Sequence, residues 1–94
     1  MKKYGRTDAN HTQIVKELRQ LGFSVESTAS LGRGFPDLAV GKHGKTLLVE
    51  VKDPDKPPSA RKLTSDEVRF FNTFGGAAIV AMTTEEIVDW FCGK

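Results

Sequence analysis

Two short segments, apolar for most of their length and charged at one end, constrain the fold of this chain more than any other feature. The second segment, residues 46–52, is rich in branched and apolar residues, ends in charge and predicts a β-strand. Because side chains alternate across a strand, Glu50 and Lys52 lie on one face of it. The first segment, residues 36–41, carries an acid, Asp37, directly after Pro36, and a glycine-containing turn joins the two segments as a hairpin. We therefore expect Asp37 to lie near Glu50 and Lys52 at one edge of a sheet.

Two carboxylates a few ångströms apart repel each other unless a cation offsets their charge. Mg²⁺ suits such a pair because it takes oxygen ligands and commonly uses one or two protein carboxylates. Lys52 adds a compact positive charge that could position a water or stabilise negative charge on phosphorus. Asp37, Glu50 and Lys52 together predict metal-dependent hydrolysis of phosphodiester bonds. An exposed cross-strand ion pair between Glu50 and Lys52, without chemistry, is the alternative.

These segments resemble the signature of a known group of nucleases. Residues 34–38, GFPDL, and residues 48–52, LVEVK, are similar to the PD-(D/E)XK motif. In finer detail they resemble the VRR-NUC branch and the small phage-type, Holliday-junction-resolvase-like domains near it. The similarity covers most of the chain, from Asp8 to the apolar segment 77–82. It implies a restriction-endonuclease-like α/β fold, with a mixed central sheet flanked by helices.

The resemblance also implies roles for individual residues. Asp37 and Glu50 would ligate Mg²⁺, or Mn²⁺ in its place, together with the backbone carbonyl of Val51, and Lys52 would position or activate the attacking water. In-line attack on phosphorus would leave a 5′ phosphate. The expected substrate is branched DNA, such as a flap or a four-way junction, because a small domain offers little surface for reading bases. Cutting a junction symmetrically needs two sites, so a homodimer is expected.

Two positions depart from the pattern of these nucleases. Relatives commonly carry a glutamine early in the helix after the second catalytic strand, where this chain has Glu67. Glu67 could extend the acidic site or close a capping box on Thr64. Many relatives carry a glutamate on the first helix, where this chain offers Asn10, Gln13 or Glu17. Asn10, Gln13 and Glu67 are thus candidates for an additional site. An amide is a weaker ligand than a carboxylate, so Asn10 or Gln13 in place of a glutamate argues against a second metal.

The distribution of charge points to nucleic acid more than the net charge of +2 does. Residues 1–62 hold twelve Lys or Arg against seven Asp or Glu, whereas residues 63–94 hold two against five. The basic excess therefore lies in the part of the chain that carries the acidic site. Ordinary solubilising charge is the alternative for each cation. The candidate DNA contacts are Arg33, Lys56, Arg61 and Lys62.

The rest of the chain predicts one domain over residues 1–94, with the order α-β-β-β-α-β-α. A basic tail, residues 1–7, precedes a helix that Asp8 or Asn10 could cap and that ends near Leu21. Its expected apolar stripe is Ile14, Val15, Leu18 and Leu21. Residues 23–27 alternate and predict the first strand. The three prolines of residues 53–62 argue against regular structure there.

The second half of the chain predicts two helices around one strand. The first helix begins at a capping box, Thr64 to Glu67, and should turn Val68, Phe71 and Phe74 inward. The continuous apolar run of residues 77–82 predicts a fully buried strand. The aromatic residues Phe70, Phe71, Phe74, Trp90 and Phe91 are expected to be core unless an excess is exposed and marks a dimer face. His11 could contact phosphate or move a proton, but an exposed helix position is the favoured interpretation, and His43 should lie in the turn.

The sequence also limits where this protein works. No run of eighteen apolar residues suggests a membrane span, and no apolar segment follows the basic N-terminus as in a secretory signal. A single cysteine, Cys92, is compatible with a reducing cytoplasm, bacterial or that of a phage-infected host. Two alternatives to the DNA endonuclease stay open. One is a catalytically silent DNA-binding or assembly domain with the nuclease fold, and the other is a nuclease acting on RNA.

Overall fold

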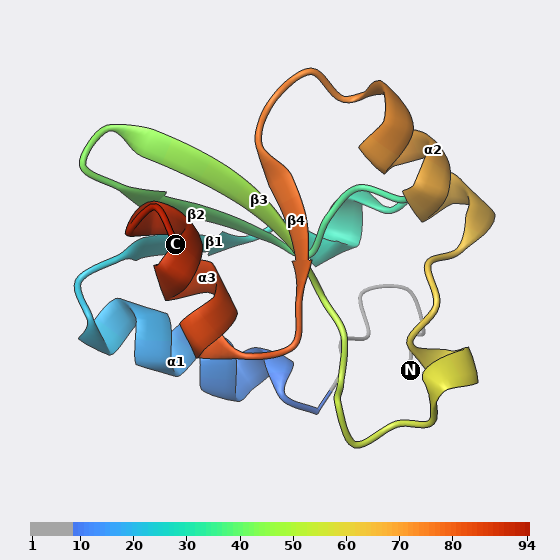
Figure 1. Ribbon diagram of the computed structural model, residues 1–94, viewed down its shortest axis with the longest axis horizontal. Coiled ribbons are helices and arrows are strands. Elements are labelled where there is room, and N and C mark those ends of the chain that lie inside the picture. The colour runs from blue at the N-terminus through green and yellow to red at the C-terminus, as the bar shows by residue number, and fades with distance from the viewer. Residues whose placement is uncertain (1–8) are drawn as a thin grey trace.

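A computed structural model describes residues 9–94 of the chain, so the basic tail at 1–7 and the capping candidate Asp8 lie outside the described residues. The protein is a small α/β domain with a four-stranded mixed sheet (Figure 1), which confirms the predicted class. In chain order the helices and strands are α1 (His11–Gln20), β1 (Ser24–Ser27), β2 (Leu38–Lys42), β3 (Lys45–Val51), α2 (Ser65–Thr73), β4 (Ala78–Ala81) and α3 (Thr84–Phe91). Two 3-10 turns, Ala29–Leu31 and Pro58–Ala60, lie in the connecting loops. The second shows that the proline-rich loop does contain a short regular turn, because proline is tolerated at a first helical position.

The strands lie in the order β1-β2-β3-β4. The first three are antiparallel and β4 runs parallel to β3. A two-residue turn joins β2 to β3 through His43 and Gly44, whose φ angles of 54° and 79° are those of a type I′ hairpin. This turn pairs Leu38 with Val49, so the residue before β2 reaches the end of β3. The hairpin register therefore decides where the acidic side chains meet.

The core lies between the sheet and the helices α1 and α3, which cover one face of it (Figure 1). Leu47, Val49 and Val51 of β3 alternate toward this face and are buried, as the sequence predicts. The buried apolar residues are Ile14, Leu18, Phe23, Val25, Leu38, Val40, Leu47, Val49, Val51, Ala81 and Ile87. Leu21 does not join this stripe, because α1 has already ended and its side chain is exposed.

The prediction that α2 turns an apolar face into the core is wrong. The helix buries none of its residues fully, and Val68 and Phe74 each keep 42% of their surface exposed. The ring of Phe70 instead lies 5.3 Å from that of Phe35 and 4.7 Å from that of Phe74, centroid to centroid. Figure 1 shows the reason, since α2 stands beside the loop that leads into β2 and not over the sheet. Trp90 and Phe91 of α3 are half-buried against the core.

The prediction of a fully buried strand at residues 77–82 is also wrong. Of β4, only Ala81 is buried, and Val80 keeps 42% of its surface exposed. β4 is an edge strand, and its side chains alternate between the face under α1 and α3 and the opposite face. The run of small and apolar residues therefore predicts a strand correctly here, but it does not predict that both faces of that strand are buried.

Gly34 lets the loop before β2 approach the first turn of α2. Its φ is +82°, and a Cβ built there would lie 2.4 Å from the backbone oxygen of Asp66. We expect Gly34→Ala to lower the free energy of unfolding by about 2–4 kcal/mol, because it adds a steric clash to the cost of a positive φ. Urea denaturation measures this. The matched control is Gly44→Ala, with a φ of +79° and open space around it, so equal losses in the two variants would contradict the packing argument.

Within residues 9–94, no helix combines the length and the apolar character that crossing a membrane requires.

Candidate active site

The hairpin brings Asp37, Glu50 and Lys52 together at the end of β3. One carboxylate oxygen of Asp37, Oδ2, accepts a hydrogen bond of 2.9 Å from the backbone N–H of Val51. Lys52 Nζ lies 3.4 Å from Glu50 Oε2, on the face of β3 that both residues share. Strand alternation and hairpin register, both readable from the sequence, thus account for this meeting.

Glu67 completes the group from the first turn of α2. Its Oε1 accepts a hydrogen bond of 3.0 Å from Lys52 Nζ and one of 2.9 Å from the backbone N–H of Thr64. The backbone N–H of Glu67 in turn donates to Thr64 Oγ1. The two interpretations of Glu67 are therefore compatible, because one carboxylate closes the capping box and also faces the lysine. We call Asp37, Glu50 and Glu67, grouped around Lys52, the acidic cluster.

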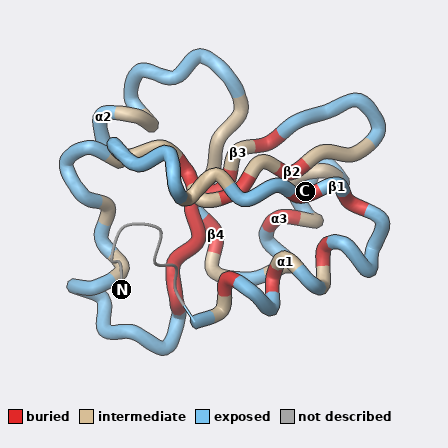
Figure 2. The backbone as a smooth tube through the Cα atoms, turned by 180° about the vertical axis from the view of Figure 1, so that it is seen from behind, coloured by how far each residue is buried: buried red, intermediate tan, exposed pale blue. Residues whose placement is uncertain are grey.

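Glu50 and Lys52 of the acidic cluster are withdrawn from solvent, and Asp37 and Glu67 are half-buried. Glu50 keeps 5% and Lys52 keeps 9% of its surface exposed, and the chain stays buried through Asp53. Figure 2 shows the buried stretch continuing beyond the end of the sheet. Charged side chains are rarely buried to this degree unless they are paired or serve a function. An exposed ion pair on a solvated face, the alternative raised by the sequence, does not describe Glu50 and Lys52.

Burial sets the protonation of the two strand carboxyls. It raises the pKa of Glu50 to about 8, helped by the charge of Asp37 and by the charge and hydrogen bond of Glu67. Burial also raises the pKa of Asp37, although the N–H of Val51 and the charge of His11 oppose that rise. Glu50 therefore holds a proton at neutral pH when no cation is bound, and that proton must leave before Glu50 can act as a ligand.

Lys52 and Glu67 stabilise each other in their charged forms. Burial works to lower the pKa of Lys52, but its contacts with Glu67 and Glu50 outweigh burial and raise it. For Glu67, burial works to raise the pKa, and the Thr64 N–H together with Lys52 brings it below its usual value. At neutral pH the cluster thus contains an ammonium ion, an ionised Glu67 and a protonated Glu50.

The donor set of the cluster fits a hard divalent cation. Asp37 and Glu50 supply carboxylate oxygens, and burial raises the pKa of both although Lys52 acts to lower it. Within residues 9–94, no three His, Cys, Asp or Glu side chains are arranged to hold a metal by themselves. Mg²⁺ needs only one or two protein carboxylates, since water and substrate phosphate complete its coordination. Val51 meets Asp37 through its backbone N–H, and a ligand role for its carbonyl stays a prediction.

Asn10 and Gln13 do not extend the acidic cluster as ligands. The side-chain amide of Asn10 donates to the backbone oxygens of Lys52 and Met82, each at 3.0 Å. Asn10 stands at the N-cap position of α1, but its side chain makes no capping hydrogen bond, because the amide is engaged across the fold instead. The other capping candidate, Asp8, lies outside the described residues. Gln13 is exposed and donates to Glu17 at 2.7 Å. Asn10 therefore anchors the backbone beside the cluster, and Gln13 takes no part in it.

The four cations named as DNA contacts lie in different settings. Arg33, Lys56 and Lys62 are exposed, and Arg33 adopts a φ of 57° in the loop before β2. Arg61 is half-buried, and its Nη1 lies 3.7 Å from the sulfur of Met82, whose backbone Asn10 holds. Contact with DNA stays a prediction for all four residues.

His11 is the residue that sequence reasoning missed. It keeps only 8% of its surface exposed, so the expectation of an exposed helix position is wrong. Its Nε2 is buried and has no hydrogen-bond partner, and its charge lowers the pKa of Asp37. A signal was present, because His11, Ile14 and Leu18 follow the i, i+3, i+7 spacing of one helix face. His11 therefore extends the buried stripe of α1 toward the acidic cluster.

The arrangement unites two hard-ligand carboxyls, an oriented ammonium and a buried setting at the end of two paired strands. Such a group can assist reactions in which negative charge develops on a phosphoryl oxygen, because a cation placed in a buried site acts more strongly than in water. Comparison with known protein families and with curated protein sequences finds no match to this chain.

Proposed function

We propose that this protein is a metal-dependent endonuclease that hydrolyses phosphodiester bonds in DNA. The observation that carries the proposal is the buried contact of 3.4 Å between Lys52 Nζ and Glu50 Oε2, beside an Asp37 hydrogen-bonded to the same strand. Two carboxyls with raised pKa values next to a buried lysine are costly to a fold of this size. A functional demand explains their presence better than stability does.

The same proposal assigns the fold to the restriction-endonuclease-like architecture, in the VRR-NUC branch of the PD-(D/E)XK nucleases. Its support is the hairpin of β2 and β3, which carries Asp37 just before the first strand and Glu50 and Lys52 at the end of the second. The element order α-β-β-β-α-β-α is the order that this assignment requires.

In the proposed mechanism Asp37 and Glu50 would hold Mg²⁺, or Mn²⁺ in its place, and the carbonyl of Val51 would be a further ligand. When bound, the metal offsets the charge of the carboxylates and polarises a phosphoryl oxygen. Lys52 holds the attacking water in line with the scissile bond, and Glu67 keeps the ammonium in place through their hydrogen bond of 3.0 Å. Attack expels the 3′ oxygen and leaves a 5′ phosphate.

Branched DNA is the proposed substrate and a second copy of the chain the proposed partner. A four-way junction or a flap presents shape and backbone to a small domain, and backbone contacts need no base readout. Leu31, Val68 and Phe74 expose apolar surface, which a dimer could cover. The exposed, unpaired thiol of Cys92 suits the reducing cytoplasm of a bacterium or a phage-infected cell, which we propose as the place of action.

End-labelled linear duplex, flap, single-stranded and four-way-junction DNA, with an RNA duplex beside them, test the function directly. Each would be incubated with Mg²⁺, Mn²⁺, Ca²⁺ or EDTA. We expect cutting of branched DNA with Mg²⁺ or Mn²⁺ and none with EDTA. DNA binding without cutting under every condition would refute the nuclease activity and support a catalytically silent DNA-binding domain. Cutting of RNA alone would show that the substrate is RNA and not DNA.

Metal binding should release a proton, because Glu50 has a pKa of about 8 before the metal arrives. We expect the apparent affinity for Mn²⁺ to rise about tenfold per pH unit from pH 6 to pH 8 and then to level off. Isothermal titration calorimetry at pH 7, in two buffers of different ionisation enthalpy, would count close to one proton released. Glu26→Gln, which removes an exposed carboxyl on β1, is the matched control and should leave the count unchanged. Binding without proton release would contradict the protonated state of Glu50.

A further inference from the structure

A second site lies outside the acidic cluster, between α1 and β1. It is a surface pocket of about 590 Å³, within the usual size of a small-ligand site. Its described polar lining is His11, Thr12, Lys16, Arg19, Gln20 and Ser27. This lining contains two cations and no carboxylate, which favours an anionic ligand.

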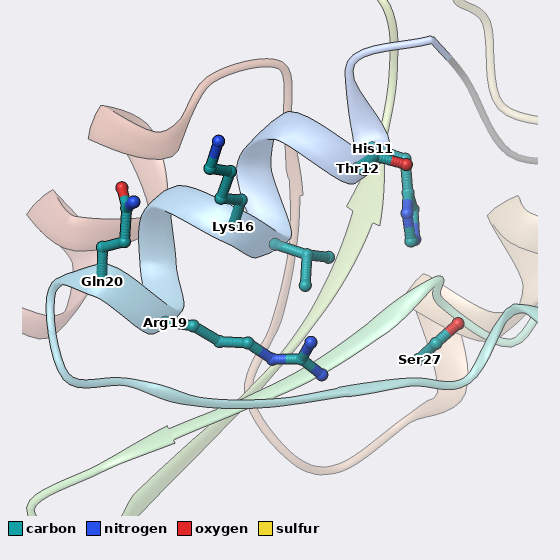
Figure 3. A pocket seen from close by; sticks show the side chains of 7 residues that line it. His11, Thr12, Lys16, Arg19, Gln20 and Ser27 are labelled. Carbon is teal, nitrogen blue, oxygen red and sulfur yellow. The ribbon is translucent and has the colours of Figure 1, made fainter.

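Arg19 is held in position at one end of this pocket. Its Nη2 donates a hydrogen bond of 2.8 Å to the backbone oxygen of Val25 in β1, so the guanidinium is fixed along the strand. A guanidinium has five N–H donors in a planar fork, and most of them remain for a ligand. Figure 3 shows the guanidinium of Arg19 and the ring of His11 on the side of α1 that faces β1, with Ser27 opposite.

His11 lies at the other end of the pocket. More than nine-tenths of its surface is buried, and its Nε2 has no hydrogen-bond partner among residues 9–94. A buried nitrogen without a partner is costly to the fold, and a ligand oxygen could remove that cost by accepting a hydrogen bond from it. Because the charge of His11 also acts on Asp37, this end of the pocket is the end nearer the acidic cluster.

We propose that the pocket between α1 and β1 binds a short segment of sugar-phosphate backbone, with one phosphate at Arg19 and a second phosphate, farther along the same strand, at His11 and Ser27. The two ends are eight residues apart on α1, which is about 12 Å along a helix, so the pocket spans more than one phosphate. The choice of nucleic acid as the source of these phosphates rests on the proposed nuclease function. The pocket would then hold the strand beside the bond that the acidic cluster cuts.

The first test measures DNA binding by fluorescence anisotropy, with Ca²⁺ in place of Mg²⁺, over a range of salt concentrations. Arg19→Gln should weaken binding about 5- to 20-fold and reduce the slope of log K against log salt by about one, as loss of a single phosphate contact does. The matched control, Lys94→Gln, removes an exposed cation at the C-terminus of the chain and should change neither value.

Because Arg19 also holds Val25, the thermal unfolding of Arg19→Gln would be recorded, and Arg19→Lys would be compared as the variant that retains the charge. Arg19→Lys should recover the salt slope and only part of the affinity, since it lacks the fork. A folded Arg19→Gln with wild-type affinity and slope would overturn the proposal.

A second test does not depend on cutting. Imidazole ¹⁵N NMR signals of metal-free wild-type protein would be followed during addition of a 5′-phosphorylated trinucleotide or of inorganic phosphate. A shift of the His11 signals that saturates at a lower concentration of trinucleotide than of phosphate supports the proposal, even if no DNA is ever cut and the nuclease function fails. No shift with either ligand, or tighter binding of inorganic phosphate, would overturn the proposal even if the protein proves to be a nuclease.

Discussion

Glu50→Gln should abolish DNA cutting and at the same time stabilise the metal-free protein at pH 8. The rate should fall at least about 1,000-fold, because the proposed metal loses one of its two carboxylates. The stability gain follows from the pKa of about 8 that burial imposes on Glu50. This folded-state value lies above the ordinary 4.5, so the wild type loses stability as pH rises from about 4.5 through 8. An uncharged amide escapes that loss, which we expect to be about 1–3 kcal/mol at pH 8.

Urea denaturation in EDTA at pH 5, 6.5 and 8 measures the stability of Glu50→Gln, and junction cleavage measures its activity. The free energies of unfolding of the variant and the wild type should be nearly equal at pH 5, because the folded wild type then carries a protonated, uncharged Glu50. The control Glu26→Gln, which removes an exposed carboxyl on β1, should change neither the cleavage rate nor the stability at pH 8. A Glu50→Gln protein that cuts at the wild-type rate, or that is less stable than wild type at pH 8, would be incompatible with a strained ligand at this position.

The hairpin and its charged residues could be predicted because local rules determine them. Side-chain alternation places Glu50 and Lys52 together whatever the rest of the chain does. The two-residue turn at His43 and Gly44 then fixes the register that brings Asp37 to the end of β3. Few long-range contacts are needed for this part of the site. The capping box at Thr64 is local in the same sense, and the structure confirms it.

The position of α2 could not be predicted because no local rule governs it. The spacing of Val68, Phe71 and Phe74 indicates an apolar helix face, but not what that face will contact. The close approach of Gly34 to Asp66 holds the helix beside the loop before β2, and the rings of α2 then pack on Phe35 and on one another. That contact joins segments more than thirty residues apart in the sequence. It also carries Glu67 to Lys52, which is why the capping residue becomes part of the site.

His11 and Asn10 show a second reason for error. Residue type favours exposure for a histidine and capping for an asparagine at the start of a helix. In this fold the start of α1 lies against the chain that follows β3 and the chain that follows β4, where the backbone oxygens of Lys52 and Met82 accept hydrogen bonds from Asn10. The amide of Asn10 is therefore used across the fold and not as a cap, and the ring of His11 is buried with its Nε2 unpaired among the described residues. Residue-type preferences for exposure or capping therefore do not hold at the two positions where the start of α1 lies beside the acidic cluster.

Lys52→Ala should also abolish cutting, but it should change stability in the opposite direction to Glu50→Gln. Lys52 donates to Glu67 at 3.0 Å and lies 3.4 Å from Glu50, in surroundings with little solvent. Without the ammonium, Glu67 loses its partner, and we expect the metal-free protein to lose about 2–4 kcal/mol at pH 8. At pH 5 the loss should be smaller, because Glu67 can take up a proton once the lysine that lowers its pKa is gone.

Urea denaturation with and without Mg²⁺, together with cleavage of a four-way junction, measures these effects, and Lys94→Ala is the control for loss of an exposed lysine. Mg²⁺ should restore part of the stability of Lys52→Ala, because the ion offsets the same carboxylates, but it should not restore cutting, since it cannot replace the donor that positions the water. We expect both variants to lose cutting and their free energies of unfolding to change in opposite directions. That result would indicate that the cluster serves catalysis, because an ion pair kept for stability would make both variants less stable. If Lys52→Ala still cuts DNA, the lysine has no part in the mechanism. If both variants are equally stable at pH 8, Glu50 does not destabilise the metal-free protein.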